Sequence, residues 1–531
     1  MSDTITAISA LNEQALKTYP VSSAAEINEA MACARRAGAV WSRTDVKQRV
    51  KQLAQLESVI LTELDTITDV IMATTGKVKT EVILGEIYPV LALLRYYQKN
   101  AAQILAPCPV HTAPLAFPQA NAEIERRAYG VAAIISPWNF PFQLTLSPML
   151  TALFCGNACV FKMSELSLPV GELIMHLLAK LDLPLGLVQQ VIGAAKTGEQ
   201  LINSRPDLVF FTGSVPAGRA VMAKAAQHPI PVILELGGKD AMLVFADANL
   251  ERAVKAAMYG AFSNSGQVCV SVERCYVEAA CYEEFVGMLK DAATDVTVSH
   301  GAVGDLGGLT TLKQFAVIEA HYNDAIAKGA KASSPLRLEG RYLYPVVLWE
   351  VRQDMRIMRE ETFGPLLPVM AFDSEQHAVD LANDSDYGLN ASVWSTDIAK
   401  AERVARQLQV GSWAVNDVIK NIGHAGLPFG GVKNSGFGRY HGAEGLRQFT
   451  YTVAGLTSRS RLNDEPNWFP YSHSRYLEMR GFIDLMFGSG RLYQRIARNW
   501  RALQAFRGYA SLNLRQHWHN LLILIFKKSI G

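Results

Sequence analysis

Five short runs of apolar residues recur in the first half of the chain, and a stretch that can form a helix separates each run from the next. The runs are Val131–Ile135, Ala158–Phe161, Leu187–Ile192, Leu208–Phe211 and Val232–Leu236. Strands that are apolar along their whole length and are linked by helices form a parallel sheet with both faces buried. Ligands bind at the carboxyl ends of such strands. The chain is therefore predicted to contain an α/β domain with a site at that edge.

A second alternating set of elements follows the first. The segments with strand character are Ala241–Phe245, Cys275–Val277, Val346–Leu348, Val369–Phe372 and Trp413–Val415, and helical periodicity covers Leu250–Phe262 and Tyr282–Leu289. Residues 25–105 are also predicted to be helical, because their apolar positions recur every three or four residues. The chain has 531 residues, more than a single core usually supports. We therefore predict two parallel-sheet α/β domains in series.

Composition and cysteine usage narrow the class of protein. Hydrophobic residues make up 49% of the chain and charged residues 19%, which excludes a largely disordered or fibrous protein. The seven cysteines are irregularly spaced and odd in number, and the first residues lack a basic stretch followed by an apolar core. We therefore expect a cytoplasmic protein. No metal site is expected, because no CxxC pair faces a second pair or a His pair.

Cys269 is the candidate nucleophile. It ends the segment Asn264–Cys269, in which Gly266 would let the backbone approach a ligand closely. A nearby helix end would lower the pKa of the thiol and make it reactive. A single cysteine in an apolar setting is more often structural, so this interpretation depends on its neighbours.

Glu235 and Asn139 offer the two other groups that covalent chemistry at a carbonyl needs. Glu235 lies in an apolar strand, where burial would raise its pKa towards the range of a general base. The alternative is a strand-end carboxylate paired with Lys239. Asn139 follows the first strand and can donate an amide N–H to an oxyanion. The alternative for Asn139 is that it only closes a turn.

Three further segments predict a dinucleotide site. Gly213 and Ser214 end a strand before a helix that contains Gly218, and backbone N–H groups at a helix start can bind a pyrophosphate. Lys162 and Glu165 follow another strand and can hold the adenosine ribose. A carboxylate there would repel a 2′-phosphate, so NAD is favoured over NADP. Glu361 can bind the second ribose; the alternative is a solvated surface charge.

Together these segments resemble the aldehyde dehydrogenase superfamily, in the family's order, from about residue 25 to about residue 457. The matching motifs are Pro-Trp-Asn-Phe-Pro at 137–141, Lys-Met-Ser-Glu at 162–165, Phe-Thr-Gly-Ser at 211–214, Glu-Leu-Gly-Gly-Lys at 235–239, Gly-Gln-Val-Cys at 266–269, Glu-Thr-Phe-Gly-Pro at 361–365 and Pro-Phe-Gly-Gly-Val-Lys-Asn-Ser-Gly at 428–436. One departure is Met163, where the family commonly has proline; it predicts a slight shift of the adenosine pocket.

The resemblance implies a role for each candidate residue. Cys269 would be the nucleophile, Asn139 and the Cys269 backbone N–H the oxyanion hole, and Glu235 the base that activates the hydrolytic water. The NAD site would be lined by Trp138, Lys162, Glu165, Gly213, Ser214, Gly218, Glu361 and Phe363. The product would be a carboxylic acid, formed through a thiohemiacetal and a thioester on Cys269. Members that make acyl-CoA usually lack the carboxylate found here at Glu235.

The resemblance also implies a division of the chain. Residues 1–106 and 129–237 would form the NAD-binding domain and residues 238–436 the catalytic domain. Residues 107–128 and 437–457 would form a small oligomerisation element that makes a homodimer or tetramer. Residues 458–531 are left as a basic C-terminal extension.

The sequence leaves the aldehyde open. Residues 139–145 and 164–167 look most like enzymes for medium or long aliphatic or aromatic aldehydes, whereas residues 263–274 look closer to semialdehyde dehydrogenases. Cofactor-independent esterase activity at the same cysteine is an alternative of another class. A non-enzymatic scaffold is disfavoured because the motifs are intact. No nucleic-acid partner is expected, because the chain lacks a recognisable module.

The end of the chain is strongly basic. Residues 475–531 carry ten Arg or Lys against two acidic residues, a net charge of +8 that leaves about −6 for the rest. Residues 491–503 would form a basic amphipathic helix with Leu492, Ile496, Trp500 and Leu503 on one stripe and Arg491, Arg495, Arg498 and Arg501 around it. Two interpretations of this pattern stay open: the stripe packs on the enzyme's own body or on its dimer mate, or it makes a peripheral membrane contact. The second interpretation would imply a long, apolar aldehyde. The run Leu521–Phe526 is too short to cross a bilayer.

Overall fold

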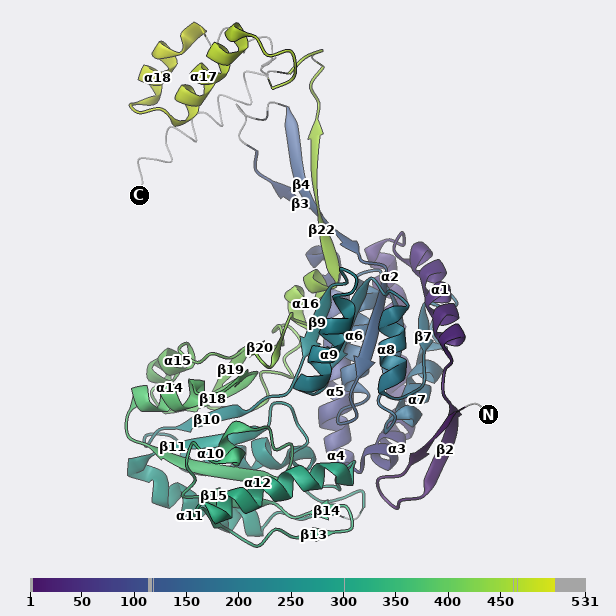
Figure 1. The fold of residues 1–531 in the computed structure, drawn as a ribbon, viewed down its shortest axis with the longest axis vertical. Helices are drawn as coiled ribbons and strands as arrows, with labels where there is room; N and C mark the ends of the chain where they lie inside the picture. Colours follow the sequence, from purple (N-terminus) through teal and green to yellow (C-terminus); the bar gives the residue numbers. More distant parts are fainter. Residues whose placement is uncertain are drawn as a thin grey trace. The chain divides into compact units, whose positions relative to one another are not determined.

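The five apolar runs form neighbouring strands of one six-stranded sheet (Figure 1). The strands are β5 (Val131–Ser136), β6 (Ala158–Met163), β7 (Val188–Gln190), β8 (Leu208–Thr212), β9 (Val232–Glu235) and β21 (Gly436–Phe437), in the order β21-β9-β8-β5-β6-β7. The first five are mutually parallel, and β21 pairs antiparallel with β9. The predicted parallel sheet is confirmed. Because the chain builds outward from β5 in one direction and then from β8 in the other, the topological switch point lies between these two strands.

The structure is a computed structural model that describes residues 3–112, 117, 119–299, 301–461, 463–465 and 467–501. The chain divides into two compact units. One consists of Met1–Ala106 and Arg127–Tyr451, and the other of Pro107–Arg126 and Thr452–Gly531. Both large sheets belong to the first unit.

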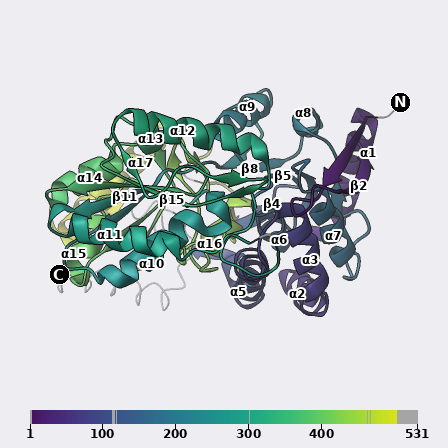
Figure 2. The same cartoon turned by 90° about the horizontal axis from the view of Figure 1, so that it is seen from below.

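Helices cover both faces of the first sheet. They are α1 (Ala24–Trp41), α2 (Val46–Thr62), α3 (Leu64–Thr75), α4 (Lys79–Val82), a π-helical turn (Ile83–Ile87), α5 (Tyr88–Ile104), α6 (Gln143–Phe154), α7 (Leu168–Leu178), α8 (Ala195–Asn203) and α9 (Val215–Ala225). Figure 2 shows α5 and α6 on one side of β5 and β8, and α8 and α9 on the other. The helical prediction for residues 25–105 is confirmed.

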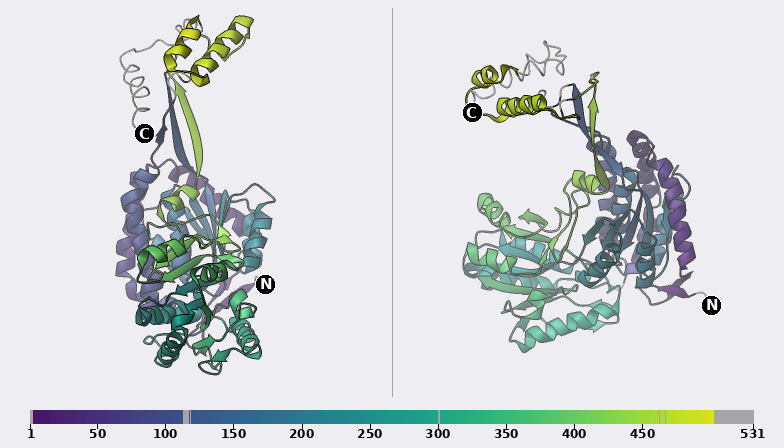
Figure 3. Two further views of the ribbon diagram at one scale, coloured as in Figure 1. Left: turned by 90° about the vertical axis from the view of Figure 1, so that its left-hand side faces the viewer. Right: turned by 45° about the horizontal axis from the view of Figure 1, so that its top comes forward.

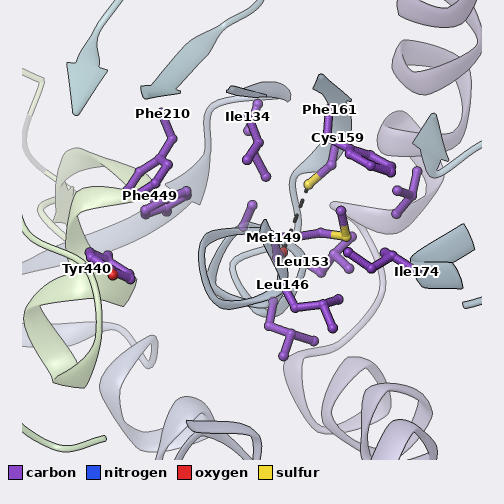
Figure 4. Close-up of a cluster of buried hydrophobic side chains, with 14 of the residues drawn as sticks. Ile134, Leu146, Met149, Leu153, Cys159, Phe161, Ile174, Phe210, Tyr440 and Phe449 are labelled. Carbon is purple, nitrogen blue, oxygen red and sulfur yellow. Dashed lines mark hydrogen bonds between the residues drawn. The ribbon is translucent and has the colours of Figure 1, made fainter. Parts of the chain in front are cut away.

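The core of this layer forms where α6 packs on the sheet (Figure 4). Ile134, Phe161 and Phe210 from three strands meet Met149 and Leu153 of α6, and all five side chains are fully buried. Each removes apolar surface from water, which is worth about 1.5–3 kcal/mol for a side chain of this size. This packing fixes the strand ends from which the site residues emerge.

A seven-stranded sheet forms the second layer. It contains β12 (Lys331–Ala332), β15 (Val346–Trp349), β16 (Leu366–Phe372), β11 (Val272–Glu278), β10 (Asp240–Val244), β18 (Asn390–Trp394) and β19 (Ser412–Val415), in that order. All neighbours are parallel except β12 and β15. Helices α10 (Leu250–Phe262) and α11 (Tyr282–Thr294) form where they were predicted. Further helices are α12 (Phe315–Ala327), α13 (Arg356–Arg359), α14 (Glu375–Asn383), α15 (Ile398–Ala405) and α16 (Gly442–Gln448).

Strand β18 and the N-terminal hairpin were not predicted from the sequence. Central strand β18 was missed because Asn390 and Ser392 interrupt its apolar pattern, although the sheet buries both of them. The N-terminal hairpin of β1 (Thr4–Ile8) and β2 (Ala15–Pro20) was missed because it is largely exposed and has no continuous apolar run. Short two-residue strands also occur at β13 (Leu338–Glu339), β14 (Tyr342–Leu343), β17 (Tyr387–Gly388) and β20 (Val432–Lys433).

The second unit contains a three-stranded sheet and a helical pair (Figure 3). The sheet has the order β22 (Thr450–Ser458), β4 (Ala120–Ala128), β3 (Cys108–Val110). The helices are α17 (His473–Phe487) and α18 (Leu492–Arg498). Helix α18 begins where the amphipathic helix was predicted and ends earlier. Leu503 and Leu521–Phe526, which belonged to that prediction, lie outside the described residues.

Candidate active site

The two large sheets meet end to end at a glycine pair. Strand β9 ends at Glu235 and β10 begins at Asp240, so the carboxyl edge of the first sheet faces the amino edge of the second. A Cβ atom on Gly238 would collide with the backbone carbonyl oxygen of Cys269, and one on Gly237 would collide with the carboxylate of Glu361. The absence of side chains at Gly237 and Gly238 therefore lets three distant segments come together.

Cys269 lies beside a cavity at this junction and is partly exposed. Burial raises the pKa of its thiol, and the nearby carboxyls of Asp240, Glu361 and Glu235 act in the same direction. The expectation that a helix end lowers this pKa is wrong. Helix α10 reaches the segment with its carboxyl end, which carries the negative end of the helix dipole. The resting thiol is therefore neutral and needs a base.

Glu235 has the environment of a general base. Its side chain is 2% exposed, and neither carboxylate oxygen has a hydrogen-bond partner among the described residues. Burial raises its pKa well above the ordinary range of a carboxyl group. The alternative of a pair with Lys239 is ruled out, because Lys239 forms a buried ion pair with Glu273 at 2.6 Å. An unpartnered buried carboxyl group is costly and marks a functional position.

Asn139 is fixed between two segments of the site. Its side-chain amide donates to the backbone oxygen of Gln267 at 3.0 Å, which ties it to the loop that carries Cys269. Asn264 donates to the backbone oxygen of Asn139 at 3.3 Å. An amide has two N–H donors, so one remains for an oxyanion next to the cysteine.

A buried ion pair that the sequence did not reveal supports the Asn139 loop. Lys77 and Glu86 pair at 3.0 Å, and both side chains are fully buried. Lys77 also donates to the backbone oxygen of Asn139, and Glu86 accepts the backbone N–H groups of Phe142 and Gln143 at 3.0 Å each. The pair thus holds both ends of the loop. One isolated lysine at Lys77 gives no sequence signal for this role.

The loop that carries Glu361 and Phe363 is held in the same way. The Glu273 carboxylate accepts the backbone N–H groups of Thr362 at 2.7 Å and Phe363 at 2.8 Å. Glu361 accepts the N–H of Gly238 at 3.1 Å, and burial raises its pKa to about 8. Glu361 is therefore not a solvated surface charge. The Phe363 ring meets the Trp138 ring edge to face, with centroids 5.6 Å apart.

The remaining cofactor candidates lie at the carboxyl edge of the first sheet. Lys162 is buried at the end of β6, and its amine lies 3.8 Å from the carboxylate of Glu165, which is half exposed. Burial lowers the pKa of Lys162. Met163 is fully buried in the core, and neighbouring strand residues point to opposite faces. The predicted shift of the adenosine pocket therefore has no support.

Gly213 and Ser214 lie at the open start of α9, next to the switch point. Ser214 is the exposed N-cap residue, and its side chain makes no capping hydrogen bond. A Cβ on Gly218 would fall 2.5 Å from Leu236, so glycine here lets the first turns of α9 pack on the strand end. The start of helix α9 next to the switch point, with Lys162 and Glu165 at the end of another strand of the sheet, fits a dinucleotide.

The cavity beside Cys269 has a volume of about 1300 Å³ and is lined mainly by apolar and aromatic side chains. Among its lining residues are Leu84, Tyr88, Phe140, Met258, Tyr259, Phe262, Val268, Trp394, Ile419, Phe429 and Tyr440. Leu84, Tyr88 and Tyr259 are also more than half exposed, which places apolar surface at the entrance.

Comparison with known proteins now decides the family. The profile of the Aldehyde dehydrogenase family matches residues 1–454. The chain belongs to the aldehyde dehydrogenase family. It is 59% identical to a 4,4'-diapolycopene aldehyde oxidase of Methylomonas sp over 98% of each chain. It is 34% identical to a protein of Mycolicibacterium smegmatis, named provisionally as a succinate-semialdehyde dehydrogenase [NADP(+)], over 85% of this chain and 88% of that protein.

Solved structures agree with this aldehyde dehydrogenase fold. Betaine aldehyde dehydrogenase of Staphylococcus aureus in complex with NAD+ superposes with a TM-score of 0.82 at 29% identity, over 88% of this chain and 94% of that one. An aldehyde dehydrogenase of Anabaena variabilis gives a TM-score of 0.83 at 33% identity, over 88% and 100%. The chain is thus an oxidoreductase that converts aldehydes to carboxylic acids, as predicted, in a family that uses NAD or NADP.

The Lys77–Glu86 pair yields a first prediction. Lys77→Met leaves the Glu86 carboxylate buried without its cation, which should lower the free energy of unfolding by about 3–5 kcal/mol. Urea unfolding of the single variant measures this loss. The double variant Lys77→Met/Glu86→Gln should recover part of it, because no uncompensated charge remains. Equal stability of the wild type and Lys77→Met would contradict the proposed support.

Proposed function

We propose that this aldehyde dehydrogenase oxidises a long, apolar aldehyde, with Cys269, Glu235 and Asn139 in the roles that the family resemblance implies. The observation that carries the substrate class is the apolar cavity that reaches Cys269. Its volume exceeds the roughly 300–1,000 Å³ of most small-molecule sites. An extended hydrocarbon would bury most of its surface there, and burial of apolar surface supplies the binding energy.

The charges around the cavity argue against a semialdehyde substrate. A semialdehyde carries a carboxylate that needs an uncommitted cation. The lining residues Arg252, Lys255 and Lys420 are 61%, 75% and 83% exposed. Arg252 and Lys420 lie within 4 Å of the Asp417 carboxylate, and Lys255 pairs with Glu251 at 2.7 Å. Each of these cations therefore already has an anionic partner.

The relatives favour the same choice. The Methylomonas relative is named for a 4,4'-diapolycopene aldehyde, and it matches this chain along nearly its whole length. The relatives named for succinate semialdehyde are 33–34% identical and match a shorter part. We therefore propose a polyene or similarly extended apolar aldehyde.

The reaction follows from the placement of the three side chains. The Cys269 thiol loses its proton to water in the cavity as its sulfur adds to the aldehyde carbon, and the oxygen accepts hydrogen bonds from the Asn139 amide and the Cys269 backbone N–H. A bound NAD would supply the acceptor for the hydride that leaves this carbon. Glu235 then takes a proton from a second water, the oxygen of that water attacks the resulting thioester, the carbon–sulfur bond breaks, and the proton passes from Glu235 to the sulfur. Aldehyde, NAD+ and water thus become acid, NADH and a proton.

We propose that NAD is preferred to NADP in this chain. Lys162 and Glu165 would hold the adenosine ribose, and the half-exposed Glu165 carboxylate would repel a 2′-phosphate. Gly213, Ser214 and Gly218 would receive the pyrophosphate at the start of α9. Glu361, Trp138 and Phe363 would contact the second ribose and the nicotinamide end.

We further propose that the three-stranded sheet mediates a homodimer or tetramer. All three residues of β3 are exposed, which leaves an unpaired strand edge available for another chain. Leu456 of β22 is 57% exposed on the same sheet.

The substrate class is tested with a panel of aldehydes in which NADH formation is followed. The value of kcat/KM should rise with apolar chain length, by up to about fourfold per buried methylene, because each is worth about 0.8 kcal/mol. Tyr259→Ser at the cavity entrance should lower kcat/KM for a long aldehyde and leave a short one unchanged. Leu185→Ser, at an exposed site outside the cavity lining, is the control. A higher kcat/KM for succinate semialdehyde than for a long alkanal would contradict the proposal.

The nucleophile is tested with Cys269→Ala. Because the carbonyl then has no covalent partner, NADH formation should fall at least about a thousandfold. Asn139→Ala should lower kcat by about 100- to 1,000-fold through loss of one oxyanion donor. Substantial ester hydrolysis by Cys269→Ala without NAD would show that a different site carries the alternative esterase activity.

The base is tested through pH. The folded protein raises the pKa of Glu235, so this carboxyl group is protonated at low pH and gains its base form only as pH rises through the raised pKa. Turnover should therefore increase with pH above the ordinary carboxyl range. Glu235→Gln should remove this increase of turnover with pH and give a burst of about one NADH per site followed by slow turnover. Unchanged steady-state turnover in Glu235→Gln would refute the assignment.

A further inference from the structure

Helix α17 carries an outward stripe that the sequence pattern had not singled out. Tyr476, Ile483 and Phe487 are 59%, 55% and 78% exposed. With the exposed Arg480 they are spaced four, three and four residues apart, so they lie on one face of the helix. A long row of exposed apolar side chains is unusual on a soluble surface and marks an interaction site.

Exposed aromatic side chains also occur in the segment before α17 and on helix α18. Trp468, Phe469 and Tyr471 are 54%, 81% and 66% exposed, and the last two rings lie 4.7 Å apart. On α18, Tyr493 is 61% exposed, whereas the predicted stripe residues Leu492 and Ile496 are partly buried. Tryptophan and tyrosine are the side chains that favour the boundary between water and lipid.

The arginines of this region fall into two groups. Arg475 pairs with Asp464, Arg498 contacts Asp484, and Arg495 donates to the backbone oxygens of Leu485 and Met486. These three arginines connect α17 to the loop before it and to α18. Arg480, Arg491 and Arg501 are exposed and form no ion pair within the described part of the chain. They are available to an anionic surface.

We propose that the tail surface, formed by the loop Trp468–Tyr471 and helices α17 and α18, docks peripherally onto an anionic lipid bilayer. Aromatic and aliphatic side chains would enter the interface while the three uncommitted arginines meet lipid phosphates. Among the described residues no helix is long and apolar enough for a membrane crossing.

The distribution of this region among relatives supports a link to apolar substrates. The family profile ends at residue 454, before the tail surface begins. The Methylomonas relative, named for a 4,4'-diapolycopene aldehyde, matches 98% of this chain, whereas the semialdehyde relatives match 85–86%. The idea that lipid docking brings the enzyme to an aldehyde dissolved in the membrane rests on the proposed function. The lipid binding itself does not depend on it.

The test is flotation of the full-length protein with two kinds of vesicle, phosphatidylcholine alone and phosphatidylcholine mixed with phosphatidylglycerol. We expect binding to the anionic vesicles and its loss at high salt, where charges are screened. Ile483→Ser/Phe487→Ser should lower partitioning at least about tenfold, because two apolar side chains no longer enter the interface. The control Leu185→Ser/Val303→Ser removes two even more exposed apolar residues from the first unit and should leave binding unchanged.

The charge contribution is measured separately. Arg480→Gln/Arg491→Gln/Arg501→Gln should lower partitioning about a hundredfold, since each basic residue near an anionic surface contributes about a fivefold factor. Lys47→Gln/Lys51→Gln/Lys99→Gln removes three exposed charges from the first unit and should leave binding unchanged.

Turnover of a short, soluble aldehyde separates this proposal from the proposed function. Tail variants should retain it while losing flotation, and should turn over a vesicle-embedded apolar aldehyde more slowly. Failure of the wild type to float, or tail variants that float like the wild type, overturns the docking proposal whatever the substrate panel gives. A reduced oligomeric mass of Ile483→Ser/Phe487→Ser in light scattering, with flotation unchanged, would instead assign the surface to a contact between copies.

Discussion

The close approach of the Gly237–Gly238 backbone to the Cys269 carbonyl is the contact on which the site depends. It joins the carboxyl edge of one parallel sheet to the amino edge of the other. Any side chain at Gly238 would push the cysteine loop away from Glu235 and Glu361. Strand ends in tightly packed sheets move little. The glycine pair therefore fixes the position of the Cys269 loop relative to Glu235 and Glu361.

Around this contact, some of the buried charged groups form ion pairs, and one carboxyl group does not. Two buried ion pairs, Lys77–Glu86 and Lys239–Glu273, each satisfy the backbone N–H groups of a loop, and thereby hold the amide donor and the cofactor-facing carboxylate. Glu235 is left without such a partner, so its proton affinity is raised. The same low-polarity surroundings raise the pKa of the Cys269 thiol. The site thus holds a carboxyl group of raised proton affinity near a neutral thiol.

The two units of the chain contribute different kinds of surface. The first contains an apolar cavity that Cys269 lines, and the second exposes aromatic side chains and arginines. An apolar aldehyde is poorly soluble, so an enzyme that uses one benefits from a surface that binds where the aldehyde resides. The proposed substrate class and the proposed lipid contact are thus both consistent with a substrate that is poorly soluble in water.

The sequence by itself predicted the layers and proposed the reacting groups. Continuous apolar runs such as Val131–Ile135 predicted buried strands, and the motifs in family order proposed Cys269, Glu235 and Asn139 as the reacting residues. Tertiary structure decided what local pattern does not encode: the Lys77–Glu86 support, the burial of polar strand β18, and the partner of Lys239. It also reversed the expected shift of the cysteine pKa, because burial and the carboxyl groups of Asp240, Glu361 and Glu235 surround the sulfur only in the folded chain. These features arise from side chains far apart in sequence, and their energies exist only once the segments are packed together.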